Sequence, residues 1–110
     1  MANSRDRREL RIPLQAVVYR HAKWWIAHCL ELDLVAEGKT PAQALKDLVE
    51  LSTTQIESAV DSGNLETVFR SAPSEVWALF SRSRELALPP IRKSLWRSID
   101  RFEAREAVLV

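Results

Sequence analysis

Hydrophobic and polar residues follow a strand-like pattern in the first third of the chain. Residues 14–20 (LQAVVYR) and 24–30 (WWIAHCL) are rich in β-branched and aromatic side chains, which favour β-strands. Apolar residues between positions 32 and 36 predict a third short strand, which ends before a turn at Gly38. We expect these three segments to form an antiparallel meander.

A long amphipathic helix is predicted directly after this turn. Thr40 followed by Pro41 is the pattern of an N-cap residue with proline at the first helical position, and Gln43 stands where a capping box has Glu or Gln. Apolar residues then recur at three- and four-residue spacing from position 42 to 60, so one stripe of the helix is expected to lie on the sheet. Gly63 can adopt the left-handed conformation that ends a helix.

The second half of the chain has a weaker pattern. Residues 65–72 form a connection, either a loop or a short strand, and the run after Pro73 predicts a short helix near residues 74–85. The sequence LPPI at 88–91 ends that helix. The last segment fits both a helix and a strand, because its apolar residues match either spacing.

Length and composition indicate one domain with a packed core. The chain has 110 residues, of which 46% are hydrophobic, and a domain of this size can fold without disulfides or metals. We predict a flexible basic arm at residues 1–11 and a single domain at 12–110. The chain has one cysteine, no apolar signal segment and no run of about eighteen apolar residues to span a membrane, so a cytoplasmic protein is expected.

The charge distribution is more informative than the net charge of +1. Residues 30–66 contain eight acidic residues and two lysines, which gives this segment a net charge of −6. An acidic surface favours encounter with a basic protein. The alternative is that these acids form the solvated face of the helix. The acidic residues are Glu31, Asp33, Glu37, Asp47, Glu50, Glu57, Asp61 and Glu66.

Two neighbouring tryptophans, Trp24 and Trp25, lie in the second predicted strand. Consecutive side chains of a strand point to opposite faces of the sheet, so one of the two can face the long helix and the other cannot. A solvent-exposed tryptophan leaves a large apolar surface unburied, so we expect another element or a partner to cover the second tryptophan. The second helix, with Trp77 and Phe80, can provide that cover, and so can a second copy or a foreign protein partner.

The sequence offers no catalytic or metal site that its geometry supports. His28, Cys29, Glu31 and Asp33 are close in sequence, but His28 and Cys29 point to opposite faces of a strand, and His21 is the only other histidine. A lone cysteine in a strand is usually a small core residue. The two glycines are far apart, so there is no glycine-rich phosphate loop. We expect no enzyme activity, no metal and no cofactor.

The middle of the chain carries a set of residues in a characteristic order of strand, E/Q-G-x-T turn and helix start. They are Ala27, Cys29–Asp33 (CLELD), Glu37, Gly38, Thr40, Ala44 and Leu45. In this order they resemble the small ββ(β)α module of HicB-type antitoxins and their single-domain relatives, over residues 14–60. The resemblance implies an α+β fold that closes with a strand beside the first strand, and on that ground we predict a strand at residues 101–109.

The same resemblance implies a non-catalytic binding module of the antitoxin type, which would mask a small basic RNase toxin. The candidate partner-binding residues are Trp24, Trp25, Glu31, Asp33 and Glu37. HicB-type antitoxins usually carry an additional DNA-binding segment. Because none is recognisable in this sequence, direct DNA binding is not expected.

Two other functions remain open. The chain can be an orphan adaptor or structural domain that keeps the fold and binds itself or another protein. In both binding roles we expect a homodimer or higher oligomer, because open sheets leave edge strands available for pairing. The third function is a nuclease, because the module is also similar to a fragment of the RNase H-like sheet. On this resemblance Glu31 and Asp33 are candidates to mimic two of the metal-binding carboxylates of such enzymes, and no convincing third acid is identifiable on the last strand.

Overall fold

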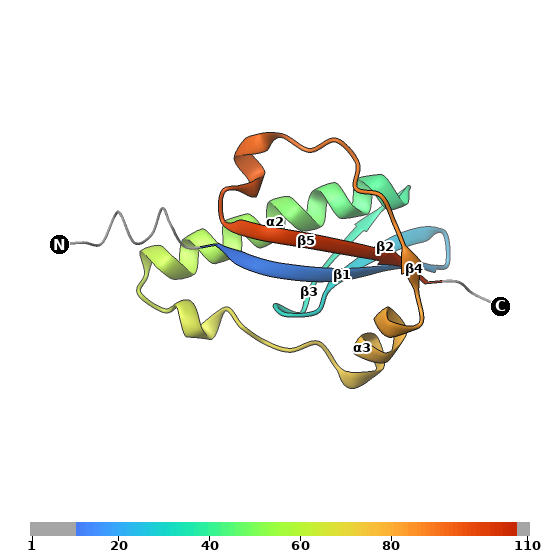
Figure 1. Ribbon diagram of the computed structural model, residues 1–110, viewed down its shortest axis with the longest axis horizontal. Helices are drawn as coiled ribbons and strands as arrows, with labels where there is room; N and C mark the ends of the chain where they lie inside the picture. Colours follow the sequence, from blue (N-terminus) through green and yellow to red (C-terminus); the bar gives the residue numbers. More distant parts are fainter. Residues whose placement is uncertain (1–10, 108–110) are drawn as a thin grey trace.

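The three predicted strands at the start of the chain form an antiparallel meander in the computed structural model, which describes residues 11–107 (Figure 1). His28 lies opposite Val17 on one neighbouring strand and opposite Val35 on the other. The third strand begins at residue 34 rather than 32, because Asp33 has a left-handed backbone (φ 53°) and belongs to the turn. The strands are β1 (Ile12–His21), β2 (Trp24–Cys29) and β3 (Leu34–Gly38).

The predicted long helix, α2 (Pro41–Asp61), begins where the capping pattern placed it. Thr40 Oγ1 accepts a hydrogen bond from the backbone N–H of Gln43 at 3.1 Å. The prediction of a full capping box is wrong, because the Gln43 side chain donates to Asp47 Oδ1 (2.9 Å) instead of turning back to Thr40. Gly63 has the expected left-handed backbone after the helix, with φ 71°.

The closing strand lies beside β1, as predicted. β5 (Ile99–Glu106) pairs with β1 in parallel, which makes the sheet mixed, and it starts two residues earlier than expected. A two-residue strand that the sequence did not indicate, β4 (Arg84–Glu85), pairs with β5 and gives the order β3-β2-β1-β5-β4. Of the predicted segments, residues 1–10 of the arm and 108–110 lie outside the described residues.

The predicted second helix is shorter than expected. α3 (Ser74–Ser81) ends four residues before position 85, because the Ser83 hydroxyl donates to the carbonyl of Leu79 (2.6 Å) and closes the last turn. The chain then joins the sheet, where the N–H of Leu86 donates to the carbonyl of Ala104 (3.0 Å). Pairing with β5 thus competes with continuation of the helix.

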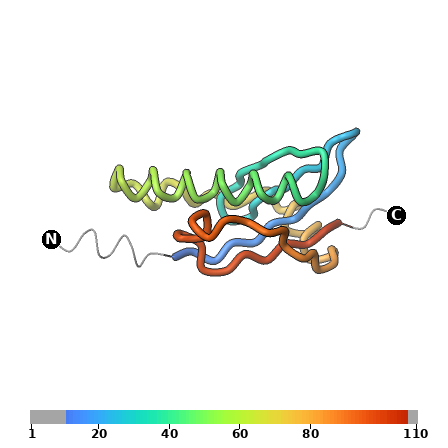
Figure 2. Tube along the Cα trace, turned by 90° about the horizontal axis from the view of Figure 1, so that it is seen from above, coloured from blue at the N-terminus to red at the C-terminus, as the bar shows by residue number. Residues whose placement is uncertain are grey.

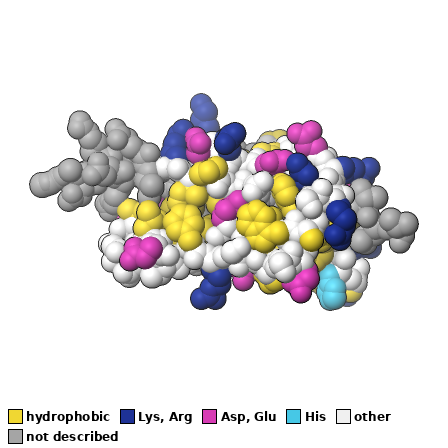
Figure 3. All heavy atoms as spheres, turned by 60° about the horizontal axis from the view of Figure 1, so that its bottom comes forward, with side chains coloured by type: hydrophobic (Ala, Val, Ile, Leu, Met, Phe, Trp, Pro, Cys, Tyr) yellow, Lys and Arg dark blue, Asp and Glu magenta, His cyan; other side chains and the backbone are white. Residues whose placement is uncertain are grey.

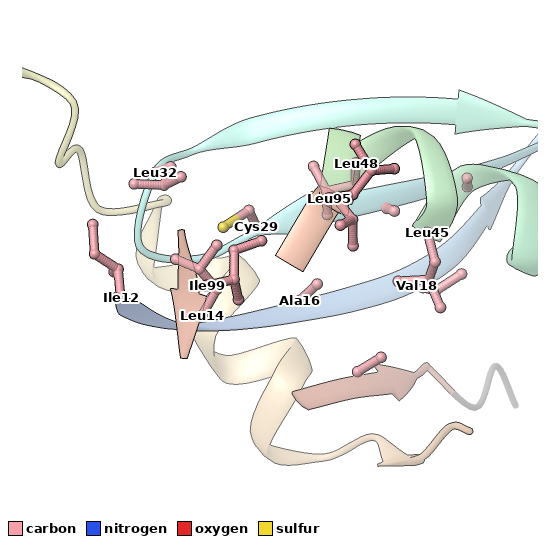
Figure 4. Packing of buried hydrophobic residues seen from close by; sticks show 14 of the residues in the cluster. Ile12, Leu14, Ala16, Val18, Cys29, Leu32, Leu45, Leu48, Leu95 and Ile99 are labelled. Carbon is pink, nitrogen blue, oxygen red and sulfur yellow. The ribbon is translucent and has the colours of Figure 1, made fainter. Parts of the chain in front are cut away.

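The two helices lie on opposite faces of the sheet (Figures 1 and 2). α2 covers the face that carries the main core, in which side chains of β1, β2 and β5 meet Leu45 and Leu48 of the helix (Figure 4). α3 covers part of the other face, where Phe80 packs with Val17, Leu30 and Ala107. The fold is therefore α+β with three layers over β1 and β2.

Two irregular connections complete the fold. The 65–72 segment, expected to be a loop or a short strand, contains a 3-10 turn, η1 (Leu65–Thr67), and then runs beside the end of β2. There the N–H groups of Arg70 and Ala72 donate to the carbonyls of Glu31 (3.1 Å) and Leu30 (2.8 Å). A second 3-10 turn, η2 (Lys93–Trp96), precedes β5.

Candidate functional site

The two tryptophans of β2 have different surroundings. Trp25 packs against the main core on the α2 face, and the Arg20 guanidinium lies 5.7 Å from its ring centre. Trp24 points to the other face and is half-buried. α3 was one of the covers expected for it, but the cluster around Phe80 contains Val17, Leu30 and Ala107 and not Trp24. α3 therefore does not cover Trp24, which keeps an exposed part.

Glu31 is part of the fold rather than of a binding surface. Its Oε1 accepts a hydrogen bond from the backbone N–H of Gln15 at 2.8 Å. The carbonyl of Leu30 would ordinarily take that place in the β1–β2 ladder, but it accepts from Ala72 instead. Burial raises the pKa of the Glu31 carboxyl, and the hydrogen bond from Gln15 opposes this rise. The Glu31 carboxylate is thus engaged by a hydrogen bond within the sheet.

Asp33 and His28 form a pair at the turn between β2 and β3. Asp33 Oδ1 lies 2.7 Å from His28 Nε2, and His28 is buried while the Asp33 side chain is 28% exposed. Asp33 tolerates the left-handed backbone that this turn requires, as short polar residues do. His28 Nδ1 is buried and has no hydrogen-bond partner among the described residues. The pair ties the turn to β2 and leaves the Asp33 side chain partly exposed.

Cys29 is a core residue, as the sequence suggested. It is fully buried on the α2 face, and His28 points to the opposite face. Burial raises the pKa of the Cys29 thiol to about 12, with the nearby Glu31 charge as a smaller cause in the same direction. A thiol that stays protonated and buried is neither a nucleophile nor a metal ligand at neutral pH.

The outer edge of β3 carries the exposed members of the candidate set. Val35 is 46% exposed. The Glu37 side chain is exposed and has no ion pair or hydrogen bond to another residue within 11–107. Glu37 lies opposite Ile26, so Trp24 is its diagonal neighbour on the same face. We call Trp24, Val35 and Glu37 the edge patch. It combines an aromatic side chain, an apolar side chain and an unpaired carboxylate.

The acidic residues of segment 30–66 do not form one surface. Glu37 lies on the face of the sheet opposite α2, whereas Asp47, Glu50 and Glu57 lie on the solvent side of that helix. Arg97 binds the Glu57 carboxylate, with Nη2 2.8 Å from Oε1. Figure 3 shows the side of the molecule that carries α3, where hydrophobic side chains lie in separate groups with acidic side chains between them. The helical acids thus match the solvated face that the sequence left open as an alternative.

Two other kinds of site are absent from the residues that the structure describes. Within 11–107 no three histidine, cysteine or acidic side chains lie close enough together to hold a metal ion. In that range, too, no helix combines the length and the apolar character that a membrane crossing requires. A shallow polar hollow of about 200 Å³ lies between the end of α2 and η1, lined by side chains that include Gln55, Ser58 and Asn64.

Comparison with known proteins gives no match: no family model, no curated protein and no solved structure is similar to this chain.

Proposed function

We propose that this protein is a non-catalytic binding module of the HicB-like antitoxin type, and that it masks a small basic RNase through the edge patch. The observation that carries the proposal is the juxtaposition of half-buried Trp24, exposed Val35 and unpaired Glu37 on one sheet face. The α+β fold, with a three-stranded meander followed by a helix, agrees with the module that the sequence resembles.

The chemistry of the edge patch suits a basic protein partner. Aromatic side chains with an exposed part are frequent anchors of protein interfaces, because they bury a large area at low conformational cost. A carboxylate at the rim of such a patch attracts lysine and arginine side chains and raises the rate of encounter. Glu37 is the main charged contact in this proposal. The carboxylates of Glu31 and Asp33 are already engaged within the fold, by the N–H of Gln15 and by His28.

The test is capture of the partner by tagged protein from lysate of the native host at low salt, followed by identification by mass. The proposal expects one small protein of high isoelectric point, released as the salt concentration rises. The captured protein should cleave RNA when it is alone and lose that activity when the tagged protein is added in excess.

A matched pair of charge reversals assigns the contact to the edge patch. Glu37→Lys and Glu50→Lys change the net charge equally and both affect exposed residues, but Glu37 lies on β3 and Glu50 on the solvent side of α2. Glu37→Lys should reduce capture by about tenfold, and Glu50→Lys should leave it unchanged. Equal loss with both variants would mean that the contact is unspecific charge attraction.

A second function, the orphan homo-oligomeric adaptor, is favoured by the open edge of β3. In that case the tagged protein captures only itself, and no RNase accompanies it at any salt concentration. The carboxylates of segment 30–66 are then solvated surface groups.

A further inference from the structure

We infer that β3 is a dimer interface, and that it pairs in antiparallel orientation with β3 of a second copy. β3 stands first in the strand order, so within residues 11–107 no strand hydrogen bonds to its outer side. An unpaired edge presents backbone N–H and C=O groups that a further strand can bind. Val35, on this edge, is 46% exposed, so apolar surface adjoins the free backbone groups.

Symmetry restricts the register of such a dimer. A two-fold axis perpendicular to the sheet keeps each side chain on its own face, so the strand must pair about one of its own residues. Pairing about Ala36 is the register in which all five residues of β3 lie opposite a residue of the second copy. Val35 then lies opposite Glu37 of the second copy, and Leu34 lies opposite Gly38. The two sheets become one, with both α2 helices on the same face.

The charges that flank β3 favour a second copy of this chain as the occupant. Asp33 precedes β3 and Lys39 follows it, so antiparallel pairing about Ala36 brings the Lys39 end of each strand beside the Asp33 end of the other, and these opposite charges attract each other. Lys39 is exposed, and Asp33 uses Oδ1 for His28 while its side chain stays 28% exposed. The exposed methyl groups of Val35 meet the aliphatic part of Glu37. Each of these contacts occurs twice.

The dimer also brings the edge patches of the two copies together. Pairing about Ala36 places the two Glu37 side chains on diagonal positions, about 7–8 Å apart. This joins the edge patches of the two copies into one surface with two carboxylates. The inference extends the self-association of the second proposed function and does not need an RNase partner, so it is tested on the purified protein alone.

The test is sedimentation equilibrium across the micromolar concentration range, with a matched pair of substitutions at Val35. The wild-type mass should rise from 12.6 kDa towards twice that value as the concentration increases. Val35→Glu places two like-charge pairs across the interface and should weaken the dimer by about tenfold, whereas Val35→Lys creates two Lys–Glu pairs and should keep or tighten it. Because Val35 is exposed, both variants should fold, which circular dichroism verifies.

Three results would overturn the inference. A wild-type protein that stays at 12.6 kDa throughout that range does not dimerise. Equal weakening by Val35→Glu and Val35→Lys means that Val35 does not face Glu37 of the second copy. An unchanged dimer in both variants means that the copies meet through another surface. The first result leaves the capture experiment unaffected, so the two proposals fail separately.

Discussion

At the scale of single residues, Glu31 shows how a charged side chain that looks like a contact can belong to the fold. Its carboxylate takes the place of a backbone acceptor at the point where β1 and β2 separate. Nothing in the sequence marks this role, because it depends on the 70–72 segment, which occupies the carbonyl of Leu30 from a distant part of the chain. The sequence drew attention to Glu31, but it could not show that its carboxylate accepts a hydrogen bond from Gln15.

Substitutions at Glu31 test this role. Glu31→Ala leaves the partly buried N–H of Gln15 without an acceptor and should lower the free energy of unfolding by about 1–3 kcal/mol. Glu31→Gln keeps a carbonyl oxygen there and removes a partly buried charge. Burial raises the folded-state pKa of Glu31, so its ionisation costs stability as the pH rises through the carboxyl range. Urea unfolding at pH 7 should show Glu31→Gln at or above wild type, and a loss equal to that of Glu31→Ala would contradict the assignment.

Cys29 provides a pH-dependent prediction. Its pKa is raised from 9.0 to about 12 in the folded protein, so the folded state holds the proton more tightly than the unfolded state. The resulting stability is complete below pH 9 and is lost as the pH rises towards 12. Cys29→Ala should lack this alkaline loss when urea midpoints at pH 8 and pH 10 are compared. The native thiol should resist a thiol reagent at pH 8, and rapid labelling without unfolding would contradict its burial.

At the scale of elements, the turn from β3 into α2 depends on Gly38. A Cβ atom at this position would lie 2.6 Å from the backbone nitrogen of Ala44 and 3.0 Å from Cβ of Gln43. Since the first of these neighbours is helix backbone, it cannot move without displacing the start of α2. Gly38 is therefore required for the close approach of strand and helix.

We predict that Gly38→Ala lowers the free energy of unfolding by about 1–3 kcal/mol through this overlap. Gly63→Ala is the control, because a Cβ there meets no atom within 4 Å and only the left-handed backbone (φ 71°) opposes it. Thermal unfolding of both variants measures the difference. A Gly38→Ala protein as stable as wild type would mean that β3 and α2 can separate without cost.

Most elements could be predicted because their signals are local. The cap at Thr40 and the apolar stripe of α2 each depend only on residues close together in the sequence. Both predictions are confirmed. The end of α3 and the strand β4 could not be predicted, because the chain leaves the helix there to pair with β5, which follows more than ten residues later. Local propensity alone favours continuation of the helix.

At the scale of the whole molecule, the last third of the chain is held to α2 by buried and exposed polar contacts. The hydroxyl of Thr53, on α2, donates to the carbonyl of Leu95 in η2, and both residues are buried. Arg97 binds the carboxylate of Glu57 one turn further along the helix. These contacts fix the entry into β5, on which the pairing with β1 depends.

Removal of the buried contact should loosen this attachment. Thr53→Val has nearly the same volume but leaves the Leu95 carbonyl unpaired, and should lower the free energy of unfolding by about 1–3 kcal/mol. Glu57→Gln, which weakens an exposed ion pair, should cost less than about 1 kcal/mol. Urea unfolding of both variants gives the comparison. Equal costs would show that burial does not strengthen the Thr53 contact.

The charge of the segment was a poor guide to the surface of the molecule. Its net charge of −6 is a property of sequence, but the sheet places Glu37 and the helical acids on opposite sides. Alternation along β2 predicted correctly that Trp24 and Trp25 point to different faces, yet which of them meets α2 depends on the register of the whole sheet.

Partner binding at the edge patch is tested by capture from host lysate with three baits in parallel: wild type, Glu37→Lys and Glu50→Lys. We expect wild type and Glu50→Lys to recover the same small basic protein, and this protein to cleave RNA until the bait is added back. Glu37→Lys should recover about tenfold less of it. Recovery of no basic protein by wild type, or equal recovery by Glu37→Lys and Glu50→Lys, would contradict partner binding at the edge patch.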